Sequence, residues 1–196
     1  MLKHKLAAAA LAATAALAAV PAAHAADEYY LKIDEIPGTV KVGKTAGAIP
    51  IESFGLGVEH PSALGSSSSG AVTAKAKFLN ITVTKMVDAT SPLFFERVAT
   101  GEHFESMEII AVKTDPKQPA GTTYMRWIFN PVFVTEQGHN GETGDDAAEE
   151  TLTFQAGVMK QHYSSTGADG KALNVITVWN QVTNSPSPLV PKELGG

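Results

Sequence analysis

The sequence predicts a mainly β protein that carries one short helix. Many segments alternate between apolar and polar residues, and turns containing glycine and proline separate them, which is typical of a compact barrel or sandwich. Only Ser91–Thr100 combines capping residues with the apolar spacing of a helix. The chain of 196 residues has no cysteine, so neither a disulfide framework nor thiolate chemistry is expected.

The first 25 residues are expected to be a signal peptide rather than part of the fold. Lys3 and Lys5 give it a positively charged start, and the apolar run Leu6–Val20 follows. Ala23–Ala25 forms an A-x-A cleavage site, so the mature chain is expected to begin at Ala26 and to be exported to the periplasm or secreted. The apolar run is too short and too rich in alanine for a membrane span.

The composition of the mature chain limits its partners. Removing 25 of the 196 residues leaves 171, which suffices for one domain with a sizeable core. The removed segment holds two lysines and no acidic residue, so the net charge changes from −5 to −7. An acidic chain without a basic stripe argues against nucleic acid and anionic membranes as partners.

Short strands are expected in the first part of the mature chain. Tyr29–Ile36 alternates and ends at a Pro-Gly turn, and Val40–Val42 and Ile49–Val58 follow as further strands. Two glycines in the last of these indicate a bulge or a close approach of another backbone. Pro61–Gly70, with four consecutive serines, is expected to be a flexible loop.

The predicted helix lies between two strands. Leu79–Thr84 alternates regularly before it, and Met107–Ala111 has one apolar face after it. Ser91 is the expected N-cap, with Pro92 at the first helical position, where its missing N–H is not needed. Gly101 suits a left-handed stop. The expected apolar face consists of Phe94, Phe95 and Val98.

The most aromatic segment is Thr123–Thr135, which follows an expected loop at Thr114–Gly121. Proline cannot donate to a sheet ladder, so a bulge or a change of strand partner is expected at Asn130-Pro131. Apolar residues occur on both faces of this strand. It is therefore either central in the core or covered on its outer face by another subunit.

The end of the chain contains two more strands. Gln137–Glu149 is expected to be an acidic surface loop, and Thr151–Val158 and Leu173–Trp179 are the strands that follow it, with an Asp-Gly turn between them. Ser185–Gly196 contains three prolines and is expected to be a flexible tail. One domain is thus predicted over residues 26–184.

No catalytic, cofactor or metal site is predicted. Four histidines remain after cleavage, and none shares the spacing of a zinc motif. The acidic residues between Glu142 and Glu150 lack the alternating frame of a calcium loop, so a solvated surface loop is expected there. No G-x-S-x-G elbow or phosphate-binding loop is present. The histidines are His60, His103, His139 and His162.

Several segments together resemble the haemolysin-coregulated proteins (Hcp), the tube subunits of type VI secretion systems. The main one is Asn80–Val112, where a strand ending in Thr-Lys precedes Asp88, Ser91-Pro92 and a T-G-x-H turn before a strand. Each short motif is weak alone, and their order and spacing carry the resemblance. The other segments are Tyr30–Gly38, Ile49–Gly57, Glu150–Phe154 and Val178–Asn180.

The resemblance implies a closed β-barrel of two sheets with the single helix packed on its side. It also implies a head-to-tail homo-oligomer, a hexameric ring that stacks into a tube and carries secreted effector cargo without catalysing a reaction. Alternate residues of Ile49–Val58 would then face the lumen. The loop His60–Lys75 would reach the neighbouring ring. The lumen-facing residues would be Ser53, Gly55 and Gly57, and the ring-stacking residues Ser66, Ser67, Ser68 and Ser69.

Two functions remain open at this point. Tube subunits are normally made without a cleaved signal, because the tube assembles in the cytoplasm, whereas an exported chain meets the periplasm first. The first function is that of a hexameric tube subunit and effector carrier. The alternative is an exported periplasmic or secreted Hcp-like binding or adhesion protein of a Gram-negative bacterium that is not part of a tube.

Overall fold

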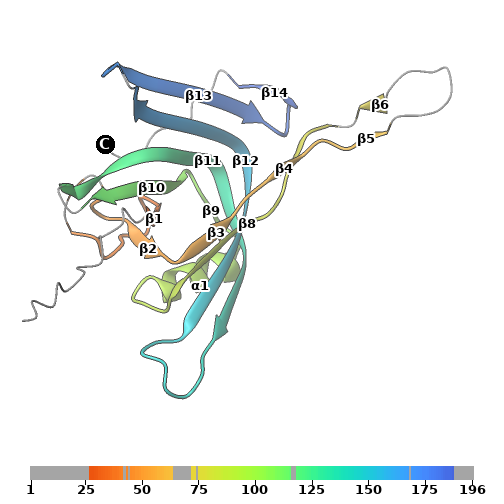
Figure 1. Cartoon of the computed structure of the whole chain (residues 1–196). Helices are drawn as coiled ribbons and strands as arrows, with labels where there is room; N and C mark the ends of the chain where they lie inside the picture. Colours follow the sequence, from red (N-terminus) through yellow and green to blue (C-terminus); the bar gives the residue numbers. More distant parts are fainter. Residues whose placement is uncertain are drawn as a thin grey trace, which may run out of the picture.

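The computed structural model describes residues 27–41, 43, 45–63, 72–73, 75–115, 118–167 and 169–187. Most of these residues belong to strands, and one helix, α1 (Ser91–Thr100), lies against the side of the sheet (Figure 1). The expected signal peptide, Ser66–Ser69 and residues 188–196 lie outside the described residues. The strands are β1 (Asp27–Lys32), β2 (Ile49–Ile51), β3 (Ser53–Gly55), β4 (Val58–Glu59), β5 (Ser62–Ala63), β6 (Val72–Thr73), β7 (Lys77–Phe78), β8 (Ile81–Met86), β9 (His103–Phe104), β10 (Met107–Asp115), β11 (Gln118–Asn140), β12 (Glu149–Thr166), β13 (Ala172–Asn180) and β14 (Ser185–Pro186).

A bent segment closes the sheet into a barrel. β2 pairs with β1, and β3, which follows after one residue, pairs with β8. At the bend, the Glu52 N–H donates to the Thr84 carbonyl at 2.8 Å. Around the rest of the barrel β8 pairs with β12, β12 with β11, β11 with β10 and β10 with β1, all antiparallel. The predicted mainly β, closed-barrel fold is confirmed, and the strands of the barrel belong to one hydrogen-bonded sheet.

The core fills the barrel from the alternating positions of these strands. Fully burying one such aliphatic or aromatic side chain stabilises a fold by about 1.5 to 3 kcal/mol. Helix α1 adds Phe94, whose ring meets Phe104 and Phe154 edge to face, with centroids 6.3 and 6.2 Å away. The fully buried apolar residues of the cluster include Leu31, Ile49, Val83, Phe94, Phe104, Met107, Ile109, Leu152 and Phe154.

The helix has the predicted bounds, but two of its predicted details are wrong. Its N-cap is Thr90 rather than Ser91, and no side chain caps it. The hydroxyl of Ser91 is instead used inside the protein, where it donates to Glu150. Phe95 is 66% exposed, because only the Phe94 side of the helix faces the barrel. At the other end Gly101 is left-handed, with φ of 71°, as predicted.

Strand β11 changes partner where proline was expected to force a change. β10 pairs with it as far as Phe129, and β9 takes over at Val132. The proline position itself, Pro131, falls between the two partners, so its missing N–H breaks no ladder. Ile128 and Phe129 are consecutive and both buried, so both faces of this strand are covered.

Three loop predictions were too long and one strand prediction was wrong. The predicted loop Thr114–Gly121 is instead a hairpin, in which strand pairing continues as far as the pair Asp115 and Gln118. The predicted loop Gln137–Glu149 is shorter than expected, because β11 extends to Asn140. Pairing with a neighbouring strand overrides the local turn signals in both cases. The serine-rich loop is also shorter than predicted, since Ser62 pairs with Thr73.

Val40–Val42 is the wrong strand prediction. Val40 forms no strand pairing; it makes single hydrogen bonds with Gly47 and Ala48, at 2.8 and 3.1 Å. Val42 lies outside the described residues. Val40 and Lys41 are therefore part of a loop rather than of a strand.

The C-terminal hairpin leaves the barrel. The first part of β12, Glu149–Phe154, pairs with β8 in the barrel, whereas its second part, Val158–Thr166, pairs with β13. β13 and β14 therefore extend beyond the barrel, and Figure 1 shows them at the end opposite helix α1. The strand β14 also means that pairing continues two residues into the expected tail, because Ser185 pairs with Asn180.

Candidate functional site

The predicted lumen residues lie on and just beyond β3. Ser53 and Gly55 are exposed, whereas the residue between them, Phe54, packs inward against Tyr29 and Trp127. The two exposed positions therefore share the outer face of the barrel. Gly57 lies beyond the strand and is half-buried. The side chain of Leu79 lies beside it, and a side-chain carbon added at Gly57 would meet Leu79 Cδ1 at 3.0 Å.

Threonines extend this face across the neighbouring strands. In the pairing between β3 and β8, Ser53 lies opposite Thr84 and Gly55 opposite Thr82. β12 continues the same rows with Thr151 and Thr153. Sequence reasoning identified the residues of β3 but not these threonines, because alternation within a strand does not show which strands lie beside β3. The small-residue face consists of Ser53, Gly55, Thr82, Thr84 and Thr151, none of them charged, whereas Thr153 in the same row is buried.

The predicted ring-stacking loop lies on an arm that projects from the barrel. β4 pairs with β7, and β5 with β6, so that two short ribbons lead away from the barrel in Figure 1. A surface ion pair spans the first ribbon, with Lys77 Nζ 3.5 Å from Glu59 Oε1. The four serines Ser66–Ser69 lie outside the described residues.

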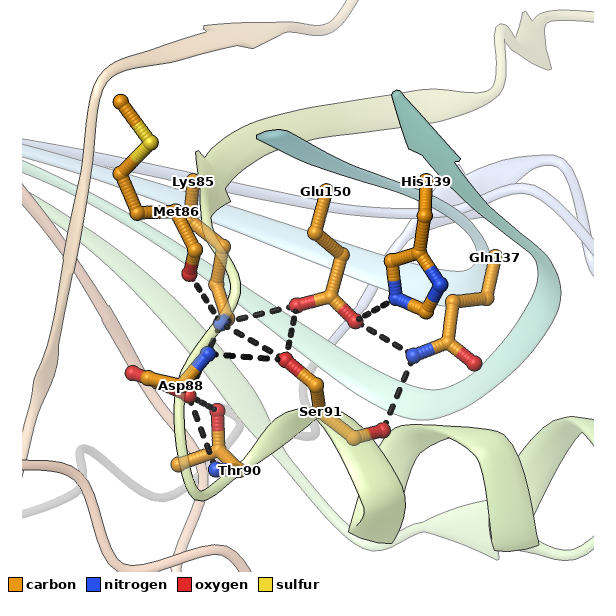
Figure 2. A network of polar contacts seen from close by, with 8 residues as sticks. All are labelled: Lys85, Met86, Asp88, Thr90, Ser91, Gln137, His139 and Glu150. Carbon is orange, nitrogen blue, oxygen red and sulfur yellow. Dashed lines mark hydrogen bonds and ion pairs between the residues drawn. The ribbon is translucent and has the colours of Figure 1, made fainter. Parts of the chain in front are cut away.

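A buried ion pair lies where helix α1 meets the barrel (Figure 2). Lys85 and Glu150 are directly opposite each other on β8 and β12, and both occupy inward positions of their strands. Lys85 Nζ lies 2.8 Å from Glu150 Oε2, and the side chains are 1% and 0% exposed. A charge at such a position is tolerated only with a close partner, because desolvation would otherwise cost several kcal/mol, about 3 to 5.

The lysine joins the helix start to the same site. Its Nζ also donates to the Met86 carbonyl at 2.8 Å and to Asp88 Oδ1 at 2.9 Å. The hydroxyl of Ser91, the first residue of the helix, lies 3.3 Å from Nζ and donates to Glu150 Oε2 at 2.8 Å. The helix N-terminus is thus fixed to two strands of the barrel by ionic hydrogen bonds.

The second oxygen of Glu150 accepts hydrogen bonds from β11. Gln137 Nε2 donates to it, and also to the Ser91 carbonyl at 2.9 Å. His139 Nε2 lies 3.3 Å from the same oxygen. Burial alone would raise the pKa of Glu150, but hydrogen bonds from Lys85, Gln137 and Ser91 hold that pKa below its ordinary value.

Asp88 completes the network at its exposed side. Burial would raise the pKa of this carboxyl, whereas hydrogen bonds from Thr90 and Lys85 lower it below its ordinary value. Sequence reasoning missed the whole network. The signal was available, because Lys85 continues the inward series that begins at Ile81, and a lysine at a core position predicts a buried acidic partner.

The described residues offer little for catalysis. No group of three or more histidine, aspartate or glutamate side chains among them could hold a metal ion. Ser164 Oγ lies 3.1 Å from His162 Nε2 but donates its proton to Asn174 Oδ1 at 2.9 Å. That hydroxyl is therefore not poised to give its proton to the histidine, as a nucleophile would. His139 faces Glu150, and the ring of His103 lies 5.4 Å from that of Phe133.

Comparison of the amino-acid sequence with known protein families gives a match. The profile of the family described as "Type VI secretion system effector, Hcp" matches residues 30–163, more than half of the chain. This chain belongs to the Hcp family of type VI secretion. No curated protein matches it at a significant level. In the part of the chain that the structure describes, no helix is long and apolar enough to cross a membrane.

Solved structures of Hcp proteins share the fold of this chain. A structure described as a type six secretion system protein has a TM-score of 0.74 at 24% identity, covering 83% of this chain and 100% of that one. Hcp1 from Salmonella typhimurium gives 0.65 at 23% identity, with 83% and 99% covered. A type VI secretion system effector from Yersinia pestis gives 0.59 at 17% identity, with 78% and 98% covered. At these identities the likeness establishes the fold.

Proposed function

We propose that the mature chain is a ring-forming structural protein of type VI secretion, a hexameric tube subunit and effector carrier. The match to the Hcp family over residues 30–163 carries this proposal. Hcp proteins assemble head to tail into rings that stack into a tube. The projecting arm supports the proposal, because a ribbon that leaves the barrel is suited to reach a neighbouring ring.

The small-residue face is the proposed wall of the lumen. Its side chains are glycine, serine and threonine, which present hydroxyl groups but no charge and no long chain. Such a surface offers no charged group that would bind one cargo strongly. In this proposal Ser53 and Gly55 face the cargo directly, and Gly57 marks the edge of the wall beside Leu79.

Gly55 offers a test of this placement. A side-chain carbon added there would meet Thr82 Oγ1 at 2.8 Å, so a larger residue requires the threonine hydroxyl to turn away. Gly55→Glu should leave the ring intact while it narrows the channel and weakens cargo retention. Gly55→Ala is the matched control, since it makes the same local contact without the long charged side chain. Collapse of the ring in the glutamate variant alone would place Gly55 at a subunit contact.

The expected signal peptide favours a second candidate function. An exported chain would reach the periplasm before any cytoplasmic tube could incorporate it. The second candidate is therefore a periplasmic or secreted Hcp-like binding or adhesion protein that uses the ring elsewhere.

Fractionation of the native host separates the two functions. As a tube subunit, the protein should appear in the medium only when the contractile apparatus is functional. Release that does not change when the apparatus is inactivated would contradict the tube role and support the second candidate. A periplasmic marker protein controls for lysis in both strains.

A further inference from the structure

The last long strand, β13, has a partner along only one of its edges. All nine of its residues, Ala172–Asn180, pair with β12. On the other side only Trp179 and Asn180 pair, with the two residues of β14. The edge from Ala172 to Val178 therefore has no strand beside it within the described residues, apart from one hydrogen bond at its end.

The direction of the backbone groups at this edge follows from that hydrogen bond. The Ser187 N–H donates to the Val178 carbonyl at 3.4 Å, so Val178 directs its backbone groups away from β12. In an antiparallel strand the N–H and C=O of one residue point to the same side, and alternate residues repeat this direction. Ile176 and Asn174 therefore also present their backbone N–H and C=O at the open edge.

The edge lacks the features by which proteins prevent strand pairing. The segment Ala172–Asn180 contains no charged residue, no proline and no glycine. Exposed apolar side chains lie on both faces of the strand, with Leu173 50% and Val175 52% exposed on one face and Ile176 52% exposed on the other. Exposed edge strands are normally protected by lysine, proline, a bulge or a cover, because an unprotected edge pairs readily with another chain.

We propose that the β13 edge, Ala172–Val178, pairs with a strand of a second copy of this chain. The inference rests on the proposed function and assigns to that ring the element through which neighbouring copies join. A second copy fits better than the chain's own C-terminal segment, because that segment carries Pro191. If β14 ran on in register, Pro191 would face the N–H and C=O of Asn174 without an N–H to donate.

A contact of this kind also accounts for the two exposed faces of β13. A strand added at the edge extends both faces of the sheet, so neighbouring side chains flank Val175 on one face and Ile176 on the other. Main-chain hydrogen bonds would supply the register of the contact and the apolar side chains its buried area.

Two substitutions at one position test the proposal in the mature protein. Asn174→Pro removes an N–H that points to the open edge, and it leaves the hydrogen bonds between β13 and β12 intact. Proline is tolerated at such an edge position when the edge is free. Asn174→Ala is the control, since it keeps the N–H and removes only the side-chain contact with Ser164. Assembly is measured by native mass spectrometry across a dilution series. The proline variant should need at least about tenfold more protein to assemble, and the alanine variant should assemble like the original.

Each other outcome has a distinct meaning. If Asn174→Pro assembles as well as the original chain, the β13 edge is not the contact, and the proposed ring function stands without it. A loss of stability in that variant without any loss of assembly would assign the edge to the chain's own C-terminal segment and overturn the proposal. If the original chain is monomeric throughout, the proposed function itself fails. Ile176→Lys, which adds a charge at the same edge, repeats the test should the proline variant not fold.

Discussion

Replacing Lys85 with methionine is expected to lower the free energy of unfolding by about 3 to 5 kcal/mol, the usual cost of removing one partner from a buried ion pair. Methionine is close to lysine in length and leaves no large cavity. The loss arises because Glu150, which is 0% exposed, would lose its 2.8 Å contact to Nζ and would have to keep an unpaired charge or take up a proton in the core. The helix start would lose a contact at the same time, because Nζ also reaches Ser91 Oγ.

The opposite substitution, Glu150→Gln, should cost less. Lys85 would retain Asp88 and the Met86 carbonyl, at 2.9 and 2.8 Å. The expected loss is therefore that of charged hydrogen bonds rather than of a full buried pair, about 1.5 to 3 kcal/mol. The order of the two variants, with Lys85→Met the more damaging, is a direct consequence of the contacts in Figure 2.

Equilibrium unfolding in urea at pH 7, with every variant at one fixed protein concentration, measures these losses. Fixed concentration is necessary because assembly contributes to apparent stability. Lys77→Met is the matched control: it breaks the exposed pair with Glu59, whose side chains are 69% and 46% exposed, and should cost less than about 1 kcal/mol. A loss for Lys85→Met no larger than that for Lys77→Met would refute the role assigned to the buried pair.

Three further predictions concern acid sensitivity, the arm and processing. The pKa of Glu150 is held below its ordinary value, so its stabilising contribution is complete above the unfolded-state pKa of about 4.3 and is lost as pH falls through the folded-state pKa. The variant Glu150→Gln should therefore show a smaller decline of the free energy of unfolding between pH 6 and 3. An unchanged decline would contradict this role of Glu150. Shortening Ser66–Ser69 should preserve single rings but weaken their stacking in electron micrographs, whereas an unfolded subunit would make the loop part of the barrel. N-terminal sequencing of exported protein should begin at Ala26, and an intact Met1 would contradict the signal peptide.

Local signals were sufficient to predict the elements that depend on them. Helix α1 was predicted with its observed bounds because Pro92 and Gly101 act on the backbone directly, through a fixed φ and a left-handed stop. The partner change of β11 at Pro131 was predictable for the same reason, since a missing N–H has the same consequence in any fold.

Features set by tertiary contacts were harder to predict. The N-cap was assigned to Ser91 because serine is a good cap, but its hydroxyl binds Glu150, which is 59 residues away in the sequence. Phe95 was placed on the buried face because helical spacing does not show where an apolar stripe ends. The loops before and after β11 were overestimated because hairpin pairing outweighs proline and glycine near strand ends.

The residues of the candidate sites also differ in whether local sequence patterns could predict their positions. Ser53 and Gly55 could be placed on one face from period-2 alternation alone. The threonines beside them could not, because their position depends on which strands pair. Lys85 and Glu150 lie two residues from the nearest inward apolar residues, Val83 and Leu152, so alternation places them inward only when it is extended by one step to a charged residue.

The subunit number of the mature protein tests the central claim most directly. Native mass spectrometry of the chain beginning at Ala26, at low micromolar concentration, should give a hexamer as the main species, because a closed head-to-tail contact buries the exposed apolar edge of β13 in every copy. A monomer as the only species across the concentration range would contradict the ring, although the barrel itself would remain.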